Sequence, residues 1–201
     1  MDLSHAEHHR VQARHYSKLQ LPRGDLWIFG YGSLMWNPDI PYVKWAPALI
    51  YGYHRALCIY SNRWRGTPEN PGLVLGLERG GACRGIAFLV KAAEVTLALE
   101  ELWAREMRRA VYRPRVVRAW LPNRETLVLT FIADPQHAGY AGKLSVKQTA
   151  RMIATCRGDR GPNLEYLART VAHLAELGVR DHHLLRVLAT ARALCERQRA
   201  A

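Results

Sequence analysis

The feature that most constrains the fold is a short apolar run that ends at two glycines flanking a tyrosine. Leu26-Trp27-Ile28-Phe29 runs directly into Gly30-Tyr31-Gly32-Ser33-Leu34-Met35-Trp36. Consecutive apolar residues fit a strand covered on both faces, and glycines permit a positive φ or the close approach of another group to the main chain. The segment predicts a buried strand that enters a tight turn. The amides of such a turn can bind a carboxylate or a developing oxyanion, but an ordinary glycine turn explains a lone G-x-G better.

Length and composition indicate a globular protein. The chain has 201 residues, of which 49% are hydrophobic and 23% are charged, so a substantial core is expected. Residues 1–24 are polar and basic, and we expect a flexible N-terminal extension followed by a single domain over residues 25–201. There is no apolar stretch of the roughly 20 residues that span a bilayer and no secretory signal. We therefore expect a cytoplasmic protein.

The cysteine and histidine patterns favour neither a disulfide framework nor a metal site. The four cysteines have no C-x-x-C and no paired spacing, which fits reduced thiols; they are Cys58, Cys83, Cys156 and Cys195. Four of the nine histidines lie in the expected extension: His5, His8, His9 and His15. Without partner ligands in a fixed frame, they favour a solvated tail over metal binding.

The formal net charge of +12 favours anionic partners: nucleic acid, a membrane surface or a small acidic substrate. Charge alone does not choose among them. The arginines are dispersed, and the chain has no RNP-like, zinc-finger or KH pattern. Nucleic-acid binding is therefore unsupported by any motif.

Strands dominate the segment from Leu26 to about Ala133, because β-branched, aromatic and aliphatic runs alternate with Pro, Gly and Asn. After the first strand, the expected strands are Ala48–Tyr60, Leu73–Leu77, Cys83–Val90, Tyr112–Leu121 and Glu125–Ala133. Pro122-Asn123 predicts a hairpin turn between the last two. Residues 62–72 contain too many helix and strand breakers for regular structure and predict an ordered loop or a flap.

Helices are expected in the middle and at the C-terminal end of the chain. Residues 92–108 place Leu99, Leu102, Trp103 and Glu106 on one helix face. Ser145 with Gln148 forms a capping box, and the other two C-terminal helices start at Asn163 and after Asp181. Strands around one helix, followed by a helical C-terminus, predict an α+β domain with a curled or barrel-like sheet.

Glu106 is the carboxylate best placed for chemistry, because it lies on the apolar helix face beside Trp103. Burial without a salt bridge raises the pKa of a carboxyl and produces a general base near neutral pH. A glutamate paired with Arg105, Arg108, Arg109 or Arg113 is at least as probable from spacing alone.

Several motifs, in order, resemble the ChaC branch of the γ-glutamylcyclotransferase-like family over residues 26 to about 190. The matching segments are Phe29-Gly30-Tyr31-Gly32-Ser33-Leu34-Met35-Trp36 with Asn37-Pro38-Asp39, Gly52-Tyr53-His54-Arg55, Arg65-Gly66-Thr67-Pro68, Pro71-Gly72-Leu73-Val74, Trp103-Ala104-Arg105-Glu106, Gly139-Tyr140-Ala141-Gly142, Cys156-Arg157-Gly158 and Gly161-Pro162-Asn163-Leu164-Glu165-Tyr166-Leu167. Their number makes the resemblance far more specific than one G-x-G.

The resemblance implies an enzyme, a lyase that releases 5-oxoproline and cysteinylglycine from glutathione without a metal or an organic cofactor. It also implies the family's fold, with a curled mixed sheet or small β-barrel flanked by helices. We expect a monomer whose partner is this small substrate, with neither nucleic acid nor membrane involved. The alternatives are a relative that acts on another γ-glutamyl amide or dipeptide, and a non-catalytic basic binding protein on the same fold.

The family's roles carry over to matching positions. Glu106 matches the catalytic glutamate, and the segment Gly30, Tyr31, Gly32, Ser33, Leu34 and Met35 matches the substrate loop. Arg55, Tyr112 and Tyr140 are second-rank candidates for the pocket lining. Structural roles are expected ahead of substrate contact for Tyr140, Asn163 and Tyr166, with Asn163 as a helix cap.

One segment departs from the family pattern. Between Glu106 and Tyr112 the chain has Met107-Arg108-Arg109-Ala110-Val111, where the family usually carries a glycine. The arginine pair either attracts the carboxylates of glutathione or forms a solvated turn.

Overall fold

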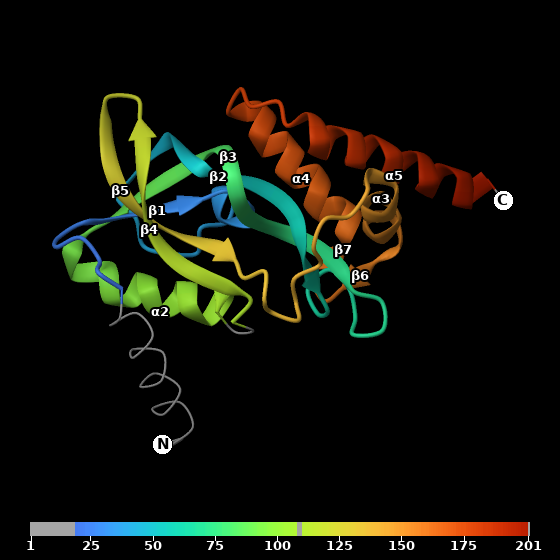
Figure 1. Ribbon diagram of the computed structural model, residues 1–201, viewed down its shortest axis with the longest axis horizontal. Coiled ribbons are helices and arrows are strands. Elements are labelled where there is room, and N and C mark those ends of the chain that lie inside the picture. The colour runs from blue at the N-terminus through green and yellow to red at the C-terminus, as the bar shows by residue number, and fades with distance from the viewer. Residues whose placement is uncertain (1–18, 108–109, 201) are drawn as a thin grey trace, which may run out of the picture. The chain divides into compact units, whose positions relative to one another are not determined.

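The computed structural model describes residues 19–107 and 110–200 (Figure 1), with side chains in the last helix described through Gln198. Most of the expected N-terminal extension, including its four histidines, lies outside the described residues. The Arg108-Arg109 pair of the family departure lies outside them as well.

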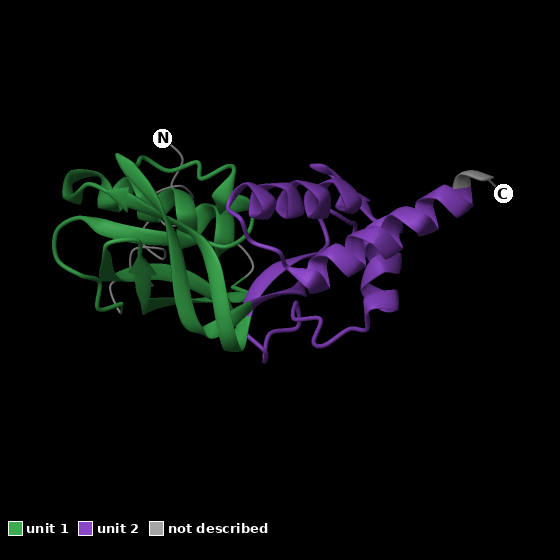
Figure 2. Cartoon of the chain, turned by 90° about the horizontal axis from the view of Figure 1, so that it is seen from above, with its two compact units in different colours: residues 1–54, 78–132 green, residues 55–77, 133–201 purple. Residues whose placement is uncertain are grey.

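The chain divides into two compact units (Figure 2). The first unit consists of residues 1–54 and 78–132, and the second of residues 55–77 and 133–201. Two long strands, β2 (Lys44–Ser61) and β3 (Gly72–Val90), contribute residues to both units.

A closed barrel contains five strands in the order β1-β3-β2-β4-β5. The remaining three are β1 (Leu26–Gly30), β4 (Tyr112–Leu121) and β5 (Arg124–Ala133). Strand β1 is antiparallel to β3 and parallel to β5. All five residues of β1 are buried, and strands pair with both of its edges, as expected for a strand within a closed barrel. The predicted mixed, barrel-like sheet and α+β class are confirmed.

Helix α2 (Val95–Glu106) follows a single 3₁₀ turn, η2 (Ala92–Glu94), and lies along the barrel in Figure 1. Its apolar face is buried as predicted: Leu99, Leu102 and Trp103 are at most 3% exposed. The Trp103 ring meets Phe131 of β5 edge-on, with ring centroids 5.6 Å apart, a favourable aromatic geometry. This packing fixes where the C-terminal end of α2 lies on the barrel.

The two short strands expected at Leu73–Leu77 and Cys83–Val90 are one strand, β3. Gly80 and Gly81 lie between the two expected strands, and they adopt φ of +98° and +71° within β3. Only glycine takes this backbone region readily, so these two residues let the strand continue where a residue with a side chain would be strained. The boundaries of β4 are as predicted.

The second unit is mainly helical, with α3 (Val146–Thr155), α4 (Asn163–Glu176) and α5 (His182–Ala200). The predicted capping box at Ser145 is present, and Asp181 caps α5 by accepting from the Leu184 amide at 3.1 Å. None of the helices in the described ranges is both long and apolar enough to cross a membrane. A two-stranded hairpin of β6 (Arg157–Gly158) and β7 (Gly161–Pro162) was not predicted, since two-residue strands leave no periodic pattern.

Asn163 does not cap α4, so that prediction is wrong. The cap position is Pro162, and the fully buried Asn163 side chain instead pairs with the backbone of Leu73. Its Oδ1 accepts from the Leu73 amide at 2.6 Å, and its Nδ2 donates to the Leu73 carbonyl at 2.7 Å. The Tyr166 hydroxyl accepts from the Leu75 amide at 3.1 Å. Both side chains therefore have the structural role expected of them, which is to hold the start of β3 against α4.

The loop over residues 62–71 is ordered because it packs on the β6–β7 hairpin. The amides of Asp159 and Arg160 donate to the carbonyls of Arg63 and Trp64 at 2.8 and 3.0 Å. A Cβ on Gly158 would lie 2.2 Å from the Arg63 carbonyl oxygen, so this close approach requires glycine. Two motifs of the second unit therefore pack against each other: Arg65-Gly66-Thr67-Pro68 in the loop and Cys156-Arg157-Gly158 at the hairpin.

We predict that Asn163→Ala lowers the free energy of unfolding by about 3 kcal/mol, because it leaves a buried amide and a buried carbonyl of Leu73 without their partner. Urea denaturation measures the change. The control Asn123→Ala, at the exposed hairpin turn, should cost less than about 1 kcal/mol. Equal losses in the two variants would refute the structural role of Asn163.

Candidate active site

The turn after β1 is tight because Gly30 lets the chain fold back on itself. Residues Ser33–Met35 form a 3₁₀ turn, η1. A Cβ on Gly30 would lie 2.8 Å from the Leu34 Cβ, so the predicted close approach is confirmed. Neither Gly30 nor Gly32 has a positive φ; that of Gly32 is −133°. The positive-φ alternative is therefore wrong.

Three amides of the turn take no part in the turn's own backbone hydrogen bonds. Met35 donates to the Gly32 carbonyl at 2.9 Å, and Asn37 donates to the Ser33 carbonyl at 2.9 Å. Within the described part of the chain, the amides of Gly32, Ser33 and Leu34 have no backbone acceptor. Their arrangement is compatible with the predicted binding of an anionic oxygen.

The larger side chains of the turn are held in the core. The Tyr31 hydroxyl donates to the Phe131 carbonyl at 2.8 Å in a buried hydrogen bond. Leu34 and Met35 are 6% and 5% exposed, while the Ser33 side chain is half-buried. Tyr31 therefore packs in the core. The Ser33 side chain instead makes a polar contact with α2.

Glu106 is the last residue of α2, and its side chain is 17% exposed. Its Oε1 lies 3.2 Å from Nε of Arg105. The expectation of a carboxylate buried without a salt bridge is therefore wrong, and the paired alternative is present. A cation at this distance stabilises the charged carboxylate, which is the form that accepts a proton.

Arg105 also connects Glu106 to the turn, a contact that sequence reasoning missed. Its Nη2 donates to Ser33 Oγ at 2.7 Å and its Nη1 donates to the Asn37 carbonyl at 2.6 Å. Asp39 Oδ2 lies 3.7 Å from Nη1 of Arg105 and accepts a hydrogen bond from the side-chain Nδ2 of Asn37 at 2.8 Å. The only signal in the sequence was the position of Arg105 directly before Glu106.

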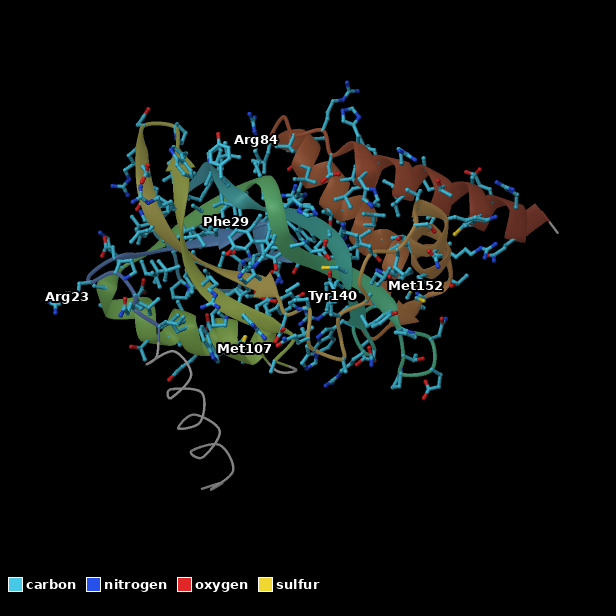
Figure 3. The ribbon with its side chains drawn as sticks, viewed as in Figure 1. Arg23, Phe29, Arg84, Met107, Tyr140 and Met152 are labelled. Atoms are coloured by element: carbon cyan, nitrogen blue, oxygen red, sulfur yellow. The ribbon has the colours of Figure 1, made fainter. Side chains whose placement is uncertain are left out.

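The connection from α2 to β4 has a residue with a left-handed backbone conformation. Ala110 adopts φ of +53°, and its amide donates to the Met107 carbonyl at 3.0 Å. Figure 3 shows Met107 at the end of α2. Tyr112, the first residue of β4, is buried at 8% exposure. Ala110 therefore has a left-handed geometry that glycine adopts more readily than alanine.

Two predicted site residues belong to the second unit. The Arg55 side chain is 4% exposed, and its Nη1 lies 3.8 Å from Asp181 Oδ2 at the start of α5. Tyr140, labelled in Figure 3, is half-buried and forms a β-bridge with Ile59. The structure thus brings Glu106 and the Gly30–Met35 turn together in the first unit, whereas Arg55 and Tyr140 have their described contacts in the second.

No cluster of three or more His, Cys, Asp or Glu side chains suited to a metal ion occurs among the described residues. Cys58, Cys83 and Cys156 are buried, and all four cysteines are free thiols. Burial raises the pKa of the Cys156 thiol, which keeps it protonated and unreactive. Its Sγ donates to Asn70 Oδ1 at 3.3 Å, so this motif cysteine has a packing role in the second unit.

The fold is that of γ-glutamylcyclotransferases. A crystal structure of a glutathione-specific γ-glutamylcyclotransferase from yeast matches with a TM-score of 0.78 and 24% identity, covering 85% of this chain and 97% of that one. The family model for ChaC-like proteins matches residues 26–194. This chain therefore belongs to the ChaC family.

Two relatives carry names that state an activity. The glutathione-specific γ-glutamylcyclotransferase of Escherichia coli K12 is 35% identical over 172 residues, covering 85% of this chain and 74% of the relative. The human glutathione-specific γ-glutamylcyclotransferase 1 is 34% identical over 181 residues, covering 84% and 82%. The similarity thus extends over most of each protein.

We predict that Ala110→Gly raises the free energy of unfolding by up to about 1 kcal/mol, because glycine removes the steric cost of a left-handed alanine and loses part of that gain to unfolded-chain entropy. Urea denaturation measures it. Ala104→Gly, exposed within α2, is the matched control and should instead cost about 1 kcal/mol. A loss of stability in both variants would contradict the left-handed geometry.

Proposed function

We propose that this protein is a glutathione-specific γ-glutamylcyclotransferase, which cleaves glutathione to 5-oxoproline and cysteinylglycine. The observation that carries the proposal is membership of the ChaC family together with relatives of that name at about one-third identity over most of the chain. The contact of Arg105 with both Glu106 and the glycine turn supports it, because it joins the two motifs in one place.

The reaction requires no external nucleophile. The α-amine of a γ-glutamyl group reaches its own δ-carbonyl and closes a five-membered lactam, so the attacking atom is already tethered and has a high effective molarity. A C–N bond forms at the δ-carbon, and the amide bond to the cysteinyl nitrogen breaks. Two protons in total pass from the attacking nitrogen to the departing one, and no water is consumed.

Glu106 is the general base in this proposal. As a carboxylate it takes a proton from the α-ammonium, which frees the lone pair for attack, and it returns the proton to the departing amine. Its pairing with Arg105 favours the charged form of the side chain, which is the form that can accept a proton. The same residue serves both transfers because the two nitrogens are bonded to one carbon in the intermediate.

The segment Gly30 to Met35 is the proposed substrate cradle. The amides of Gly32, Ser33 and Leu34 are available to the γ-glutamyl group, and one or more of them would face the oxyanion at the δ-carbon. Because the side chains of Tyr31, Leu34 and Met35 are buried, these residues offer the substrate only their backbone groups. Tyr112 belongs to the same unit as Glu106 and is proposed as additional lining of the substrate pocket, whereas a substrate contact of Arg55 or Tyr140 stays a prediction from the resemblance.

We also infer that the enzyme works as a cytoplasmic monomer on this small substrate, without a cofactor, nucleic acid or membrane. The net charge of +12 supports an anionic substrate, because a positive field raises the encounter rate with a molecule that carries carboxylates. Glutathione has two carboxylates, and so it fits that field.

We predict that Glu106→Gln lowers kcat at least about 100-fold, because glutamine keeps the shape of the side chain but accepts no proton. Release of 5-oxoproline from glutathione, and from a γ-glutamyl dipeptide for comparison, is measured by mass spectrometry. Circular dichroism checks that the fold is unchanged.

Glu101→Gln is the matched control, because Glu101 is exposed on the same helix, and it should keep wild-type turnover. A fully active Glu106→Gln enzyme would rule out the mechanism. Wild-type protein that leaves glutathione intact would rule out the activity itself.

A further inference from the structure

The guanidinium of Arg105 is mostly buried and contacts a different partner through each of its three nitrogens. Only 15% of its side chain is exposed. Its three nitrogens are divided among partners from two segments that lie about 70 positions apart in the chain: Nε faces Glu106 at 3.2 Å, Nη2 donates to Ser33 at 2.7 Å, and Nη1 donates to the Asn37 carbonyl at 2.6 Å. A largely buried cation is stable only when paired in this way.

The geometry of these contacts depends on arginine. The guanidinium is a rigid, planar fork, so fixing its Nη atoms on the turn also fixes the position of Nε beside Glu106. A lysine ammonium is a single point at the end of a flexible stem and cannot reach the three partners in a fixed arrangement. Charge alone therefore does not explain the residue.

The contact with Asn37 stabilises a particular turn conformation. The Asn37 amide already donates to the Ser33 carbonyl at 2.9 Å, and the neighbouring Asp39 has a left-handed φ of +46°. Arg105 binds both ends of this stretch, Ser33 and Asn37, and its charge also faces the Asp39 carboxylate at 3.7 Å. The turn is thus held from α2 as well as by its own hydrogen bonds.

We propose that Arg105 is a positioning residue, which holds the Ser33–Asn37 turn and the Glu106 carboxylate in one fixed arrangement. The inference rests on the proposed function, since it assigns Arg105 the task of aligning the cradle with the base. Arg105 acts through these two groups. Misplacing a base by about 1 Å costs roughly a hundredfold in rate, so a rigid connection of this kind affects kcat more than KM.

The test compares Arg105→Lys with wild type in two measurements. In hydrogen–deuterium exchange, the amides of residues 35–37 should exchange at least about tenfold faster in the variant, because the turn has lost its outer support. With glutathione as substrate, kcat should fall at least about tenfold while KM changes by less than about threefold. Ser33→Ala, which removes one of the three partners, should give a smaller increase in exchange and keeps the test possible if Arg105→Lys does not fold.

Arg118→Gln is the matched control, because Arg118 pairs with Glu125 at 3.1 Å while its side chain is 71% exposed. It should leave both measurements unchanged. Wild-type exchange in the turn of Arg105→Lys, or a wild-type kcat despite faster exchange, overturns the proposal. If the wild-type protein releases no 5-oxoproline, the proposed function fails, whereas the exchange measurement still decides whether Arg105 holds the turn.

Discussion

The pairing of β1 on both edges is the constraint on which the proposed site depends. Because β1 is antiparallel to β3 and parallel to β5, it has no free edge and is buried along its whole length. The turn that follows therefore leaves the barrel at a fixed point and in a fixed direction. The buried bonds from Tyr31 to Phe131 and from Thr130 to Phe29 attach the start of this turn to β5.

Helix α2 reaches the same place by a different route. Its buried face, with Trp103 against Phe131, sets its position on the barrel, and Glu106 is carried at its last turn. Arg105 then connects the helix to the glycine turn through Ser33 and Asn37. The proposed base and the proposed substrate cradle, which are far apart in the sequence, are thus brought together by two independent sets of packing contacts and one arginine.

Much of this arrangement was predictable from the sequence where the signal is local. The boundaries of β4, the capping box at Ser145 and the cap at Asp181 follow from patterns within a few residues, and the structure confirms them. Predictions failed where a residue far away in the sequence determines the local structure. Gly80 and Gly81 lie within one continuous strand where two separate strands were predicted, and Asn163 resembles a cap but binds Leu73, 90 positions earlier.

The same limit applies to the candidate site. The glycine turn and Glu106 were chosen as candidates from the sequence, but spacing left open whether Glu106 is unpaired or pairs with one of four arginines. The structure shows the pair with Arg105. The importance of Arg105 arises from contacts with residues 68 and 72 positions away, and no local pattern contains that information. The left-handed conformation of Ala110 is likewise set by the turn that joins α2 to β4, and the sequence pattern did not predict it.

In the proposed mechanism the α-amine of the substrate itself attacks the δ-carbonyl, so water takes no part in the bond-breaking step. Turnover of glutathione in water enriched in the heavy oxygen isotope, followed by mass spectrometry of the products, tests this directly. The account predicts 5-oxoproline without added heavy oxygen and no glutamate. Free glutamate that carries the heavy isotope would show hydrolysis of the γ-glutamyl bond and would contradict the account.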